Sequence, residues 1–345
     1  MKIVGCDLHT RYQQVAMLEE ETGELTEQRL EHENGEARGF YSSLQGPVRV
    51  GIEATGHTRW FERMLAEMGH ELWIGDAAQI RASMVRKQKT DERDAAHLLE
   101  LLVSGRFPRL WRPTMAERDL RQMVWHRQKL VWMRTAIANQ LHALAMGEGV
   151  CRKRKLFTKQ GRVELEGLNL DRWASRRRQE LLGMLDQLAA SLAEFDQAVC
   201  EQAEQNPAAG LLMTHPGVGP VTSLAFVLTL GPVERFTRSK QVVSYLGLNP
   251  REHSSGGRQR LGSISKQGNP MMRSLLVEAG HTAARLDVEL RQDYQRLKLR
   301  RGGGVAKVAI ARKLAVRMYW MLRTQRSYAQ LVRMQGSPRA TLVEQ

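Results

Sequence analysis

The sequence predicts an α/β domain in the first third of the chain and a largely helical remainder. Three observations indicate this. Short apolar runs alternate with helical patterns up to about residue 115, long helical stretches follow, and the last third opens with a helix, a glycine turn and a second helix. Strands that alternate with helices usually build a mixed or parallel sheet whose functional groups lie at the carboxyl ends of the strands. We therefore expect the chemistry of the first domain at that edge.

Turn and capping residues mark the elements of the first domain. Thr22-Gly23 is a turn signal after the first strand pair, and Glu53 ends a later strand just before Gly56. Thr90 is of a residue type that caps helix N-termini well. In order, we expect a strand pair over 3–18, a strand over 48–52, a helix over 57–68, a short strand over 71–74 and a helix over 91–104.

The middle of the chain is expected to form two long helices. Neither Gly nor Pro interrupts residues 116–146, and a second helical stretch covers about 173–205. An apolar stripe in the second stretch has heptad spacing, which fits either a helical hairpin or an intermolecular coiled coil. A helix packed on its own domain explains the pattern equally well. The stripe consists of Leu181, Leu185, Leu188, Leu192, Phe195 and Val199.

The length and composition fit a globular protein of several domains. At about 100–200 residues per domain, 345 residues suggest two or three domains. A hydrophobic content of 42% can build a sizeable core. We expect an α/β domain over 1–115, a long-helix region over 116–205, a helical domain over 206–335 and a tail over 336–345.

Several classes of protein are disfavoured. No uncharged apolar run approaches the roughly 18 residues of a membrane span, so no membrane partner is expected. The first residues, Met1–Asp7, reach an acid too early for a signal peptide. The 3 cysteines lack metal-type spacing, which argues against a disulfide scaffold or a zinc finger and fits a cytoplasmic location.

The charge balance predicts a polyanionic partner. Lys and Arg number 52 against 37 acids, a formal net charge of +15. Residues 285–326 hold twelve Lys/Arg against three acids, in what we expect to be one helical stretch. A second basic run lies in the segment from Gly149 to Val163, which contains no acid. This run either binds nucleic acid or is simply a solvated loop. This run is Arg152, Lys153, Arg154 and Lys155.

The segment Pro216-Gly217-Val218-Gly219, between two helical stretches, predicts a helix-hairpin-helix. Glycine permits a sharp turn there, and backbone N–H groups at the start of the second helix can meet a phosphate. Motifs of this kind typically bind the phosphate backbone of DNA and do not recognise the base sequence. Gly217 and Gly219 are therefore candidate nucleic-acid contacts, with an ordinary helix turn as the alternative.

Four acidic residues are candidate metal ligands. Asp7 lies within the first expected strand, where a charge is costly to bury without a partner, and Glu53 ends another strand. Asp91 and Asp94 are three residues apart near a helix start and so share one face, although they could merely favour the helix N-terminus. Oxygen ligands from several elements suit Mg²⁺ or Mn²⁺, and two such ions can clamp a phosphate during in-line displacement. Acids on two strands followed by a helical pair are typical of ribonuclease-H-like nucleases.

Six short blocks occur in order along the chain: Asp7-Leu8-His9, residues 51–56, residues 89–95, Pro216–Gly219, residues 245–250 and residues 255–269. The first three resemble the DEDD motif of the "IS one-ten" family of insertion-sequence transposases, which includes the Piv-type DNA invertases. The fourth resembles the helix-hairpin-helix of that family, and the last two resemble its transposase-domain signature. The resemblance spans most of the chain, whereas the middle helices match only in character.

The resemblance implies a DNA transposase or recombinase with a RuvC-like N-terminal domain, in which Asp7, Glu53, Asp91 and Asp94 bind Mg²⁺. It implies that Ser255 is the nucleophile of a covalent serine–DNA intermediate, in an active site shared within a homo-oligomer such as a dimer or tetramer. It also implies donor and target DNA specified by a structured guide (bridge) RNA, in a bacterial cytoplasm and associated with the nucleoid.

The loop that carries Ser255 leaves alternatives open. Ser254 offers a second hydroxyl beside it, and the Ser-Ser-Gly-Gly run also fits a plain flexible turn. A serine hydroxyl needs activation by a base or a metal; His253 is near in sequence, and metal-bound carboxylates are the other source. Candidate phosphate contacts in and beside the loop are Arg258, Arg260 and Lys266.

Two other functions remain open from the residues alone. A metal-dependent nuclease or Holliday-junction resolvase would use the same carboxylates to activate water. A non-catalytic RNA- or DNA-binding protein would need only the basic surfaces.

Overall fold

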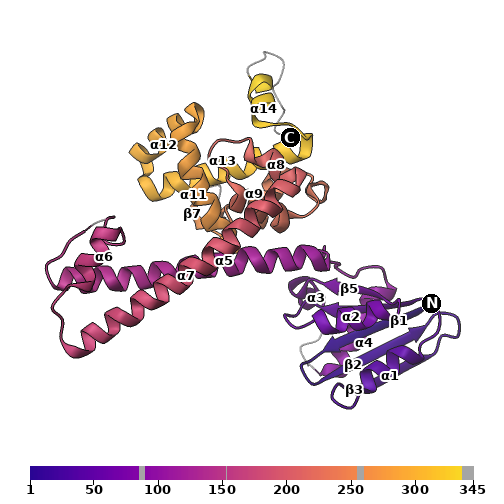
Figure 1. The fold of residues 1–345 in the computed structure, drawn as a ribbon. Coiled ribbons are helices and arrows are strands. Elements are labelled where there is room, and N and C mark those ends of the chain that lie inside the picture. Colours follow the sequence, from indigo (N-terminus) through magenta and orange to yellow (C-terminus); the bar gives the residue numbers. More distant parts are fainter. Residues whose placement is uncertain (85–89, 153, 255–259, 336–345) are drawn as a thin grey trace. The chain divides into compact units, whose positions relative to one another are not determined.

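The computed structural model describes residues 1–84, 90–152, 154–254 and 260–335 of the chain. The chain divides into two compact units, Met1–Arg112 and Pro113–Gln345 (Figure 1). The first unit is α/β and the second is mostly helical, as the sequence predicted.

A five-stranded mixed sheet is the framework of the first unit. Its strands are β1 (Lys2–Leu8), β2 (Tyr12–Glu19), β3 (Leu25–Glu31), β4 (Val48–Glu53) and β5 (Glu71–Gly75). Their spatial order is β3-β2-β1-β4-β5, with β1, β2 and β3 antiparallel and with β4 and β5 parallel to β1. The sequence predicted all of these strands except β3. That edge strand was missed because Leu30 is its one fully buried residue, so it lacks an apolar alternation.

Helices cover both faces of this sheet in the described part of the unit. On one face Tyr41 and Phe61 pack against Cys6, and on the other Leu98 packs with Ile3. The first face is covered by α1 (Glu36–Ser43) and α2 (Arg59–Glu67), and the second by α4 (Asp91–Val103), with α3 (Ala77–Ser83) beside it. The expected helices over 57–68 and 91–104 correspond to α2 and α4, whereas α1 and α3 were not expected.

The second unit contains the two long helices that the sequence predicted. They are α5 (Met115–Gly147) and α7 (Arg172–Gln205), which form a hairpin with the short α6 (Lys159–Glu166) between them along the chain (Figure 1). A full capping box begins α5: the Thr114 hydroxyl accepts a hydrogen bond from Glu117 N, and the Glu117 carboxylate accepts one from Thr114 N.

The apolar stripe of α7 is covered from within the chain. Leu181 is buried with Leu141 of α5 in one cluster, and Val199 is buried in the main core of the unit. Between them, the ring of Phe195 meets His126 of α5 edge-on at 5.1 Å. The structure therefore favours the hairpin over the intermolecular coiled coil as the reason for the heptad spacing.

The globular part of the second unit is built around α9 and α13. Its core includes the fully buried side chains of Phe226, Leu276 and Tyr319. The elements are α8 (Pro207–Met213), α9 (Pro220–Leu230), the 3-10 turn η1 (Val233–Arg235), α10 (Ser239–Tyr245), β6 (Pro250–Glu252), β7 (Leu261–Ile264), α11 (Pro270–Leu286), α12 (Val288–Arg301), α13 (Gly303–Thr324) and α14 (Tyr328–Gln335).

We expected the basic stretch over 285–326 to be one helix, but it spans the end of α11, all of α12 and all of α13. Asp287 ends α11 and caps α12 with its side chain. Gly302, with a φ of 82°, separates α12 from α13, because a right-handed helix cannot continue through a positive φ. Part of the charge is also neutralised within the chain, as by the ion pair of Asp293 with Lys313.

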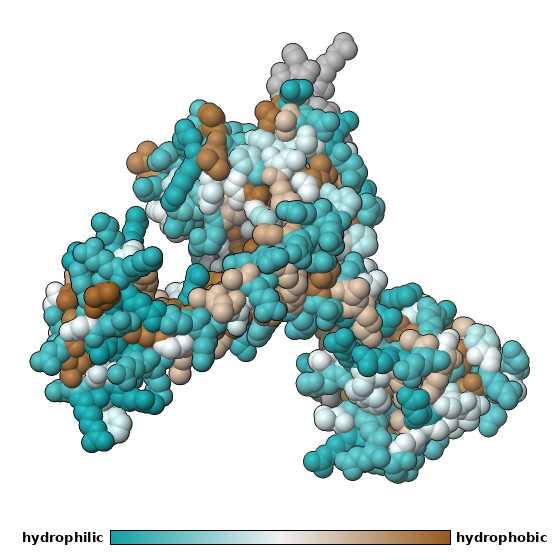
Figure 2. Space-filling model, viewed as in Figure 1, coloured by the Kyte–Doolittle hydropathy of each residue, from teal (hydrophilic) through white to brown (hydrophobic). Residues whose placement is uncertain are grey.

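The face of the molecule drawn in Figure 2 is predominantly polar. On the face drawn in Figure 2, hydrophilic residues cover most of both units and hydrophobic residues occur as scattered spots. None of the described helices combines the length and the apolar character that a membrane crossing needs.

Candidate active site

A glycine allows α4 to lie directly on β1. A Cβ atom added to Gly5 would lie 2.3 Å from the carbonyl oxygen of Ala95 in α4, closer than real side-chain atoms approach. The helix begins where the sequence predicted, because the Thr90 side chain accepts a hydrogen bond from Arg93 N at 3.4 Å. The first residues of α4 are thus brought close to the carboxyl end of β1.

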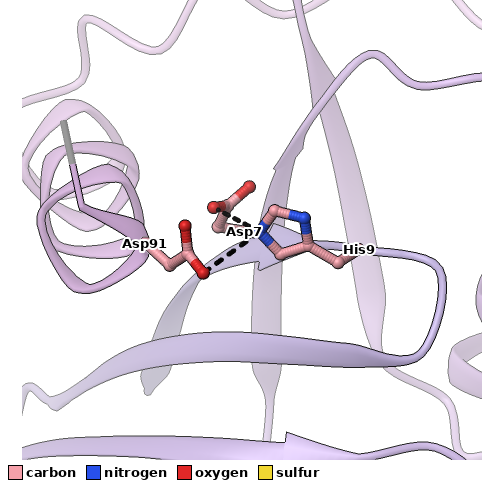
Figure 3. Close-up of side chains that lie close together, drawn as sticks. All are labelled: Asp7, His9 and Asp91. Atoms are coloured by element: carbon pink, nitrogen blue, oxygen red, sulfur yellow. Dashed lines mark hydrogen bonds and ion pairs between the residues drawn. The ribbon is translucent and has the colours of Figure 1, made fainter.

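Asp7, His9 and Asp91 converge at this edge of the sheet (Figure 3). Asp7 lies on the same face of β1 as Gly5 because side chains alternate along a strand. The Nε2 atom of His9 lies 3.1 Å from Asp7 Oδ2 and 3.5 Å from Asp91 Oδ2. One ligand atom of each residue lies within 4.8 Å of the others. Two of the four expected acids therefore meet, with a histidine between them.

Tyr12 is attached to the same group of side chains. Its hydroxyl donates a hydrogen bond to Asp91 Oδ2 at 2.8 Å, and this bond raises the pKa of Tyr12, so the hydroxyl remains a donor at neutral pH. Its ring stacks on His9 with the ring centroids 4.7 Å apart. From the sequence we predicted no role for His9 or Tyr12. The available signal for His9 was its spacing of two residues from Asp7, which puts both on one side of a strand.

The electrostatics of Asp7 are those of a crowded acidic site. Burial raises the pKa of this carboxyl, and the charges of Asp94 and Asp91 raise it further, while His9 acts in the opposite direction. A carboxylate in this situation is stabilised by a proton or by a cation. Two carboxylates within reach of one ion suit Mg²⁺ or Mn²⁺, and an imidazole in the donor set shifts the preference toward a transition metal, hence toward Mn²⁺.

Asp94 and Glu53 lie near this group but are not part of it. Asp94 is one turn after Asp91 in α4, and its charge contributes to the raised pKa of Asp7. Glu53 ends β4, whose Ile52 is in register with the residue before Asp7, so Glu53 follows at the level of Asp7 on the neighbouring strand. Among the described residues, the group within mutual ligand distance does not include either acid. Both therefore border the candidate centre.

The expected nucleophile, Ser255, and the expected phosphate contact Arg258 lie outside the described residues. The adjacent Ser254 is described, and its hydroxyl is engaged within the loop between β6 and β7. It donates to Glu252 Oε1 at 2.6 Å and accepts from Arg260 N at 3.1 Å. Ser254 thus has a structural role, because its hydroxyl links the two ends of the loop.

The basic run after α5 is only partly available to a ligand. Arg152 forms a bidentate pair with Glu164, at 2.7 and 2.6 Å, so its charge is neutralised within the chain. Lys153 lies outside the described residues. Arg154 and Lys155 are exposed, and in the described chain neither forms an ion pair. Of the other expected phosphate contacts, Arg260 and Lys266 are exposed.

The segment that we expected to form a helix-hairpin-helix folds as α8, a tight turn and α9. Its two glycines differ. Gly217 has a φ of 90°, and a Cβ atom there would lie 2.5 Å from Ala283 N in α11, so the fold itself requires glycine. Gly219 is exposed with a φ of −100°, and an added Cβ atom would meet nothing within 4 Å. Packing therefore explains Gly217 and leaves Gly219 as the better candidate for close approach of a ligand to the backbone.

Two family models match the chain. That of the IS110 DEDD transposases matches residues 4–147, and that of the transposase IS116/IS110/IS902 family matches residues 209–295. The first range contains the sheet and the candidate metal ligands. The second contains the helix-hairpin-helix and the glycine-rich loop.

Curated relatives align along most of the chain. A probable family 20 transposase of Pseudomonas aeruginosa is 27% identical over 333 residues, which cover 92% of this chain and 96% of the relative. The transposase for insertion sequence element IS1111A of Coxiella burnetii is 27% identical over 340 residues, 95% of this chain and 91% of the relative. A pilin gene-inverting protein of Moraxella bovis is 26% identical over 235 residues, 65% of this chain and 64% of the relative.

Proposed function

Because the chain belongs to the IS116/IS110/IS902 family of transposases, with a DEDD N-terminal domain, we propose that it cuts and rejoins DNA through a covalent serine–DNA intermediate. In this proposal the first unit holds a divalent cation and the second unit delivers the nucleophile. The observation that carries it is the convergence of Asp7 and Asp91 on His9, with Asp94 close enough to raise the pKa of Asp7.

Asp7 and Asp91 are the primary ligands in this proposal, with His9 as a third, and Asp94 and Glu53 complete the acidic environment. A bound Mg²⁺ or Mn²⁺ would stabilise the charge on a phosphate during displacement. The residues of the chain prepare the site for it. The Tyr12 hydroxyl orients Asp91, and His9 lies against both carboxylates. Such outer contacts fix the orientation of a ligand.

The ribonuclease-H-like, RuvC-like fold of the first unit belongs to the same proposal. Its support is the strand order β3-β2-β1-β4-β5 with acids on the adjacent central strands β1 and β4. A sheet of this order places the carboxyl ends of parallel strands side by side. Functional groups on separate strands then share one edge.

Ser255 is the proposed nucleophile. Its Oγ would form a bond to phosphorus while a deoxyribose oxygen leaves with a proton, giving a phosphoserine ester and a free sugar hydroxyl. Attack by the hydroxyl of another strand on that ester would rejoin the DNA and release the serine, without ATP. Ser254 supports this choice, because its hydroxyl is already bonded to Glu252. Arg258, Arg260 and Lys266 are the proposed contacts to neighbouring phosphates.

The proposed partners are donor and target DNA, a guide RNA and further copies of the chain as a dimer or tetramer. The support for polyanionic partners is the net charge of +15. Further proposed contacts among the described residues are the exposed Arg154 and Lys155, which form no ion pair there, and the backbone at Gly219, beside which no neighbour fills the space. The guide RNA and the oligomer follow from the family resemblance.

The test uses nicked suicide DNA substrates with the full chain, a divalent cation and the guide RNA of the element. A covalent adduct that survives denaturation, and that disappears in Ser255→Ala but persists in Ser254→Ala, supports the proposal. Hydrolysis that neither serine change affects would instead favour a metal-dependent nuclease or Holliday-junction resolvase. Binding without any cation-dependent strand breakage, unchanged by Asp7→Asn, would favour a binding protein.

A further inference from the structure

A cavity of about 330 Å³ opens on the first unit between α2 and the segment that joins β3 to α1. Its size is at the lower end of the range for small-molecule sites. The mechanism proposed above does not use it. Its wall includes His32, Gly35, Arg38, Trp60, Arg63 and Glu67.

This cavity lies on the face of the sheet that α1 and α2 cover, opposite the face of α4, and it borders the turn that follows His9. The backbone N–H of His32 donates a hydrogen bond to Arg11 O at 2.9 Å, and the His32 ring lies 3.3 Å from Thr10 O. Thr10 and Arg11 are the two residues between His9 and Tyr12, which contact Asp91. The cavity and the carboxylates therefore flank the same two-residue turn.

The chemistry of the wall is aromatic and cationic. Trp60 is 42% exposed; the His32 ring meets it edge-on with the centroids 4.7 Å apart, and in the described chain no aromatic ring stacks on it face to face. Arg63 is exposed and forms no ion pair with the described residues. The other guanidinium, of Arg38, is neutralised by Glu67 at 3.2 Å. Among the described residues, the cavity wall thus offers a partly exposed indole and one unpaired positive charge.

An exposed indole beside an unpaired guanidinium matches the two parts of a nucleotide. A base can stack on an aromatic ring, and a phosphate pairs with an arginine. Inside a duplex both faces of a base are covered by its neighbours, so the ligand must be an unpaired or extruded nucleotide.

We propose that the Trp60 cavity binds one unpaired nucleotide of the strand that the candidate centre acts on. The inference rests on the proposed function for the identity of that strand. Trp60 stacks on the base and Arg63 contacts the adjacent phosphate. Strand opening near the cut is then favoured by the first unit itself.

Photocrosslinking tests the position of the nucleotide directly. The probes are a twelve-residue oligo-dT and a twelve-residue oligo-U, each with one 5-iodouracil, bound to the full chain in EDTA. The expected result is a crosslink mapped by mass spectrometry to the segment around Trp60, which is lost in Trp60→Ala while crosslinks elsewhere remain. The two probes distinguish a DNA strand from an RNA strand as the source. Absence of a crosslink in this segment with both probes overturns the proposal.

Affinity gives a second, quantitative test. Trp60→Ala is expected to weaken binding of the preferred oligonucleotide about fivefold to a hundredfold, and Trp60→Phe to retain most of the affinity. Arg63→Ala should lower the slope of log K against log salt by about 0.7. Trp132→Ala is the matched control, because Trp132 is 49% exposed on α5. An affinity of folded Trp60→Ala within twofold of wild type, with an unchanged thermal midpoint, contradicts the proposal.

The failure of this inference can be separated from failure of the proposed function. Asp7→Asn should abolish strand cleavage but keep the Trp60 crosslink, because the acid does not line the cavity. Trp60→Ala should keep the adduct on a substrate whose cut site is already single-stranded and weaken the reaction on duplex substrate. If Asp7→Asn still cleaved DNA, the proposal that Asp7 is a metal ligand would be wrong, and the assignment of the cavity would stand.

Discussion

Asp91 accepts a hydrogen bond at 2.8 Å from the hydroxyl of Tyr12, a residue 79 positions earlier in the chain. The contact links the first residue of α4 to the start of β2. The same tyrosine ring stacks on His9. The guanidinium of Arg29, on the edge strand β3, lies 3.8 Å from the centroid of the Tyr12 ring. A chain of contacts therefore runs from the edge of the sheet to the carboxylate that we assign to the metal.

Tyr12→Phe should loosen the metal site without unfolding the unit. The change keeps the ring stacked on His9 and removes only the hydrogen bond to Asp91. Loss of such an outer contact typically lowers metal affinity about 10–100-fold. Titration of Mn²⁺, followed by calorimetry or by the rise in melting temperature, measures the change. An unaltered Mn²⁺ affinity would mean that Asp91 needs no orientation by Tyr12.

Asp7→Asn should stabilise the unit in the absence of metal and should weaken cation-dependent cleavage. The fold raises the pKa of Asp7, so the folded state holds its proton more tightly than the unfolded state. The stability that comes from this proton is present at low pH and is lost as pH rises through the folded pKa. At pH 7 the neutral amide should therefore raise the melting temperature in EDTA, while cation-dependent cleavage falls at least about 100-fold. Differential scanning fluorimetry with and without Mn²⁺ checks both signs, and stabilisation of the variant by Mn²⁺ equal to wild type would contradict them.

Gly5→Ala should separate α4 from the sheet. The added methyl group collides with backbone atoms of Ala95 and Leu99, which cannot rotate away, so the free energy of unfolding should fall by about 3 kcal/mol. Metal affinity should fall with it, because Asp91 moves away from Asp7. Gly39→Ala is the control, since nothing lies within 4 Å of its added Cβ atom and a helix gains about 0.5–1 kcal/mol from this change. Urea unfolding measures the pair, and equal stabilities would contradict the close approach.

The two glycines of the helix-hairpin-helix should respond differently. Gly217→Ala adds a methyl group at positive φ against the backbone of α11 and should destabilise the second unit by about 2 kcal/mol. Gly219→Ala should leave stability within about 0.5 kcal/mol, because the space is open, yet weaken duplex DNA binding. Thermal unfolding and fluorescence anisotropy with a duplex separate the two effects. Normal DNA affinity in Gly219→Ala would remove this turn from the interface.

His215 makes the second unit less stable in mild acid. Burial lowers the pKa of this histidine to about 4, below its ordinary value near 6.5, so the unfolded chain takes up a proton that the folded chain resists. Stability should therefore fall as the pH drops from about 6.5 toward 4, by about 2 kcal/mol between pH 7 and pH 5. His215→Gln removes this component. Urea unfolding of both proteins at the two pH values isolates it, and equal losses in wild type and variant would contradict the assignment.

Local pattern predicted much of this protein. The long helices follow from uninterrupted helical spacing, the start of α4 from Thr90, and the central strands from short apolar runs. Asp7 was identifiable because a charge inside an apolar strand is unusual, Glu53 because it ends a strand, and Asp91 and Asp94 because of their spacing near a helix start. The family blocks then ordered these signals along the chain. Each of these inferences depends only on residues that are near in sequence.

The folded chain alone establishes that His9 and Tyr12 join Asp7 and Asp91, that Arg152 is neutralised by Glu164, and that the α7 stripe packs on α5. These contacts join residues from different elements, so no local spacing encodes them. They are decided by how closely elements can pack, as where the missing side chain of Gly5 lets a helix backbone rest on a strand. Distance in space, which sequence pattern does not contain, is what turns separate acids into one site.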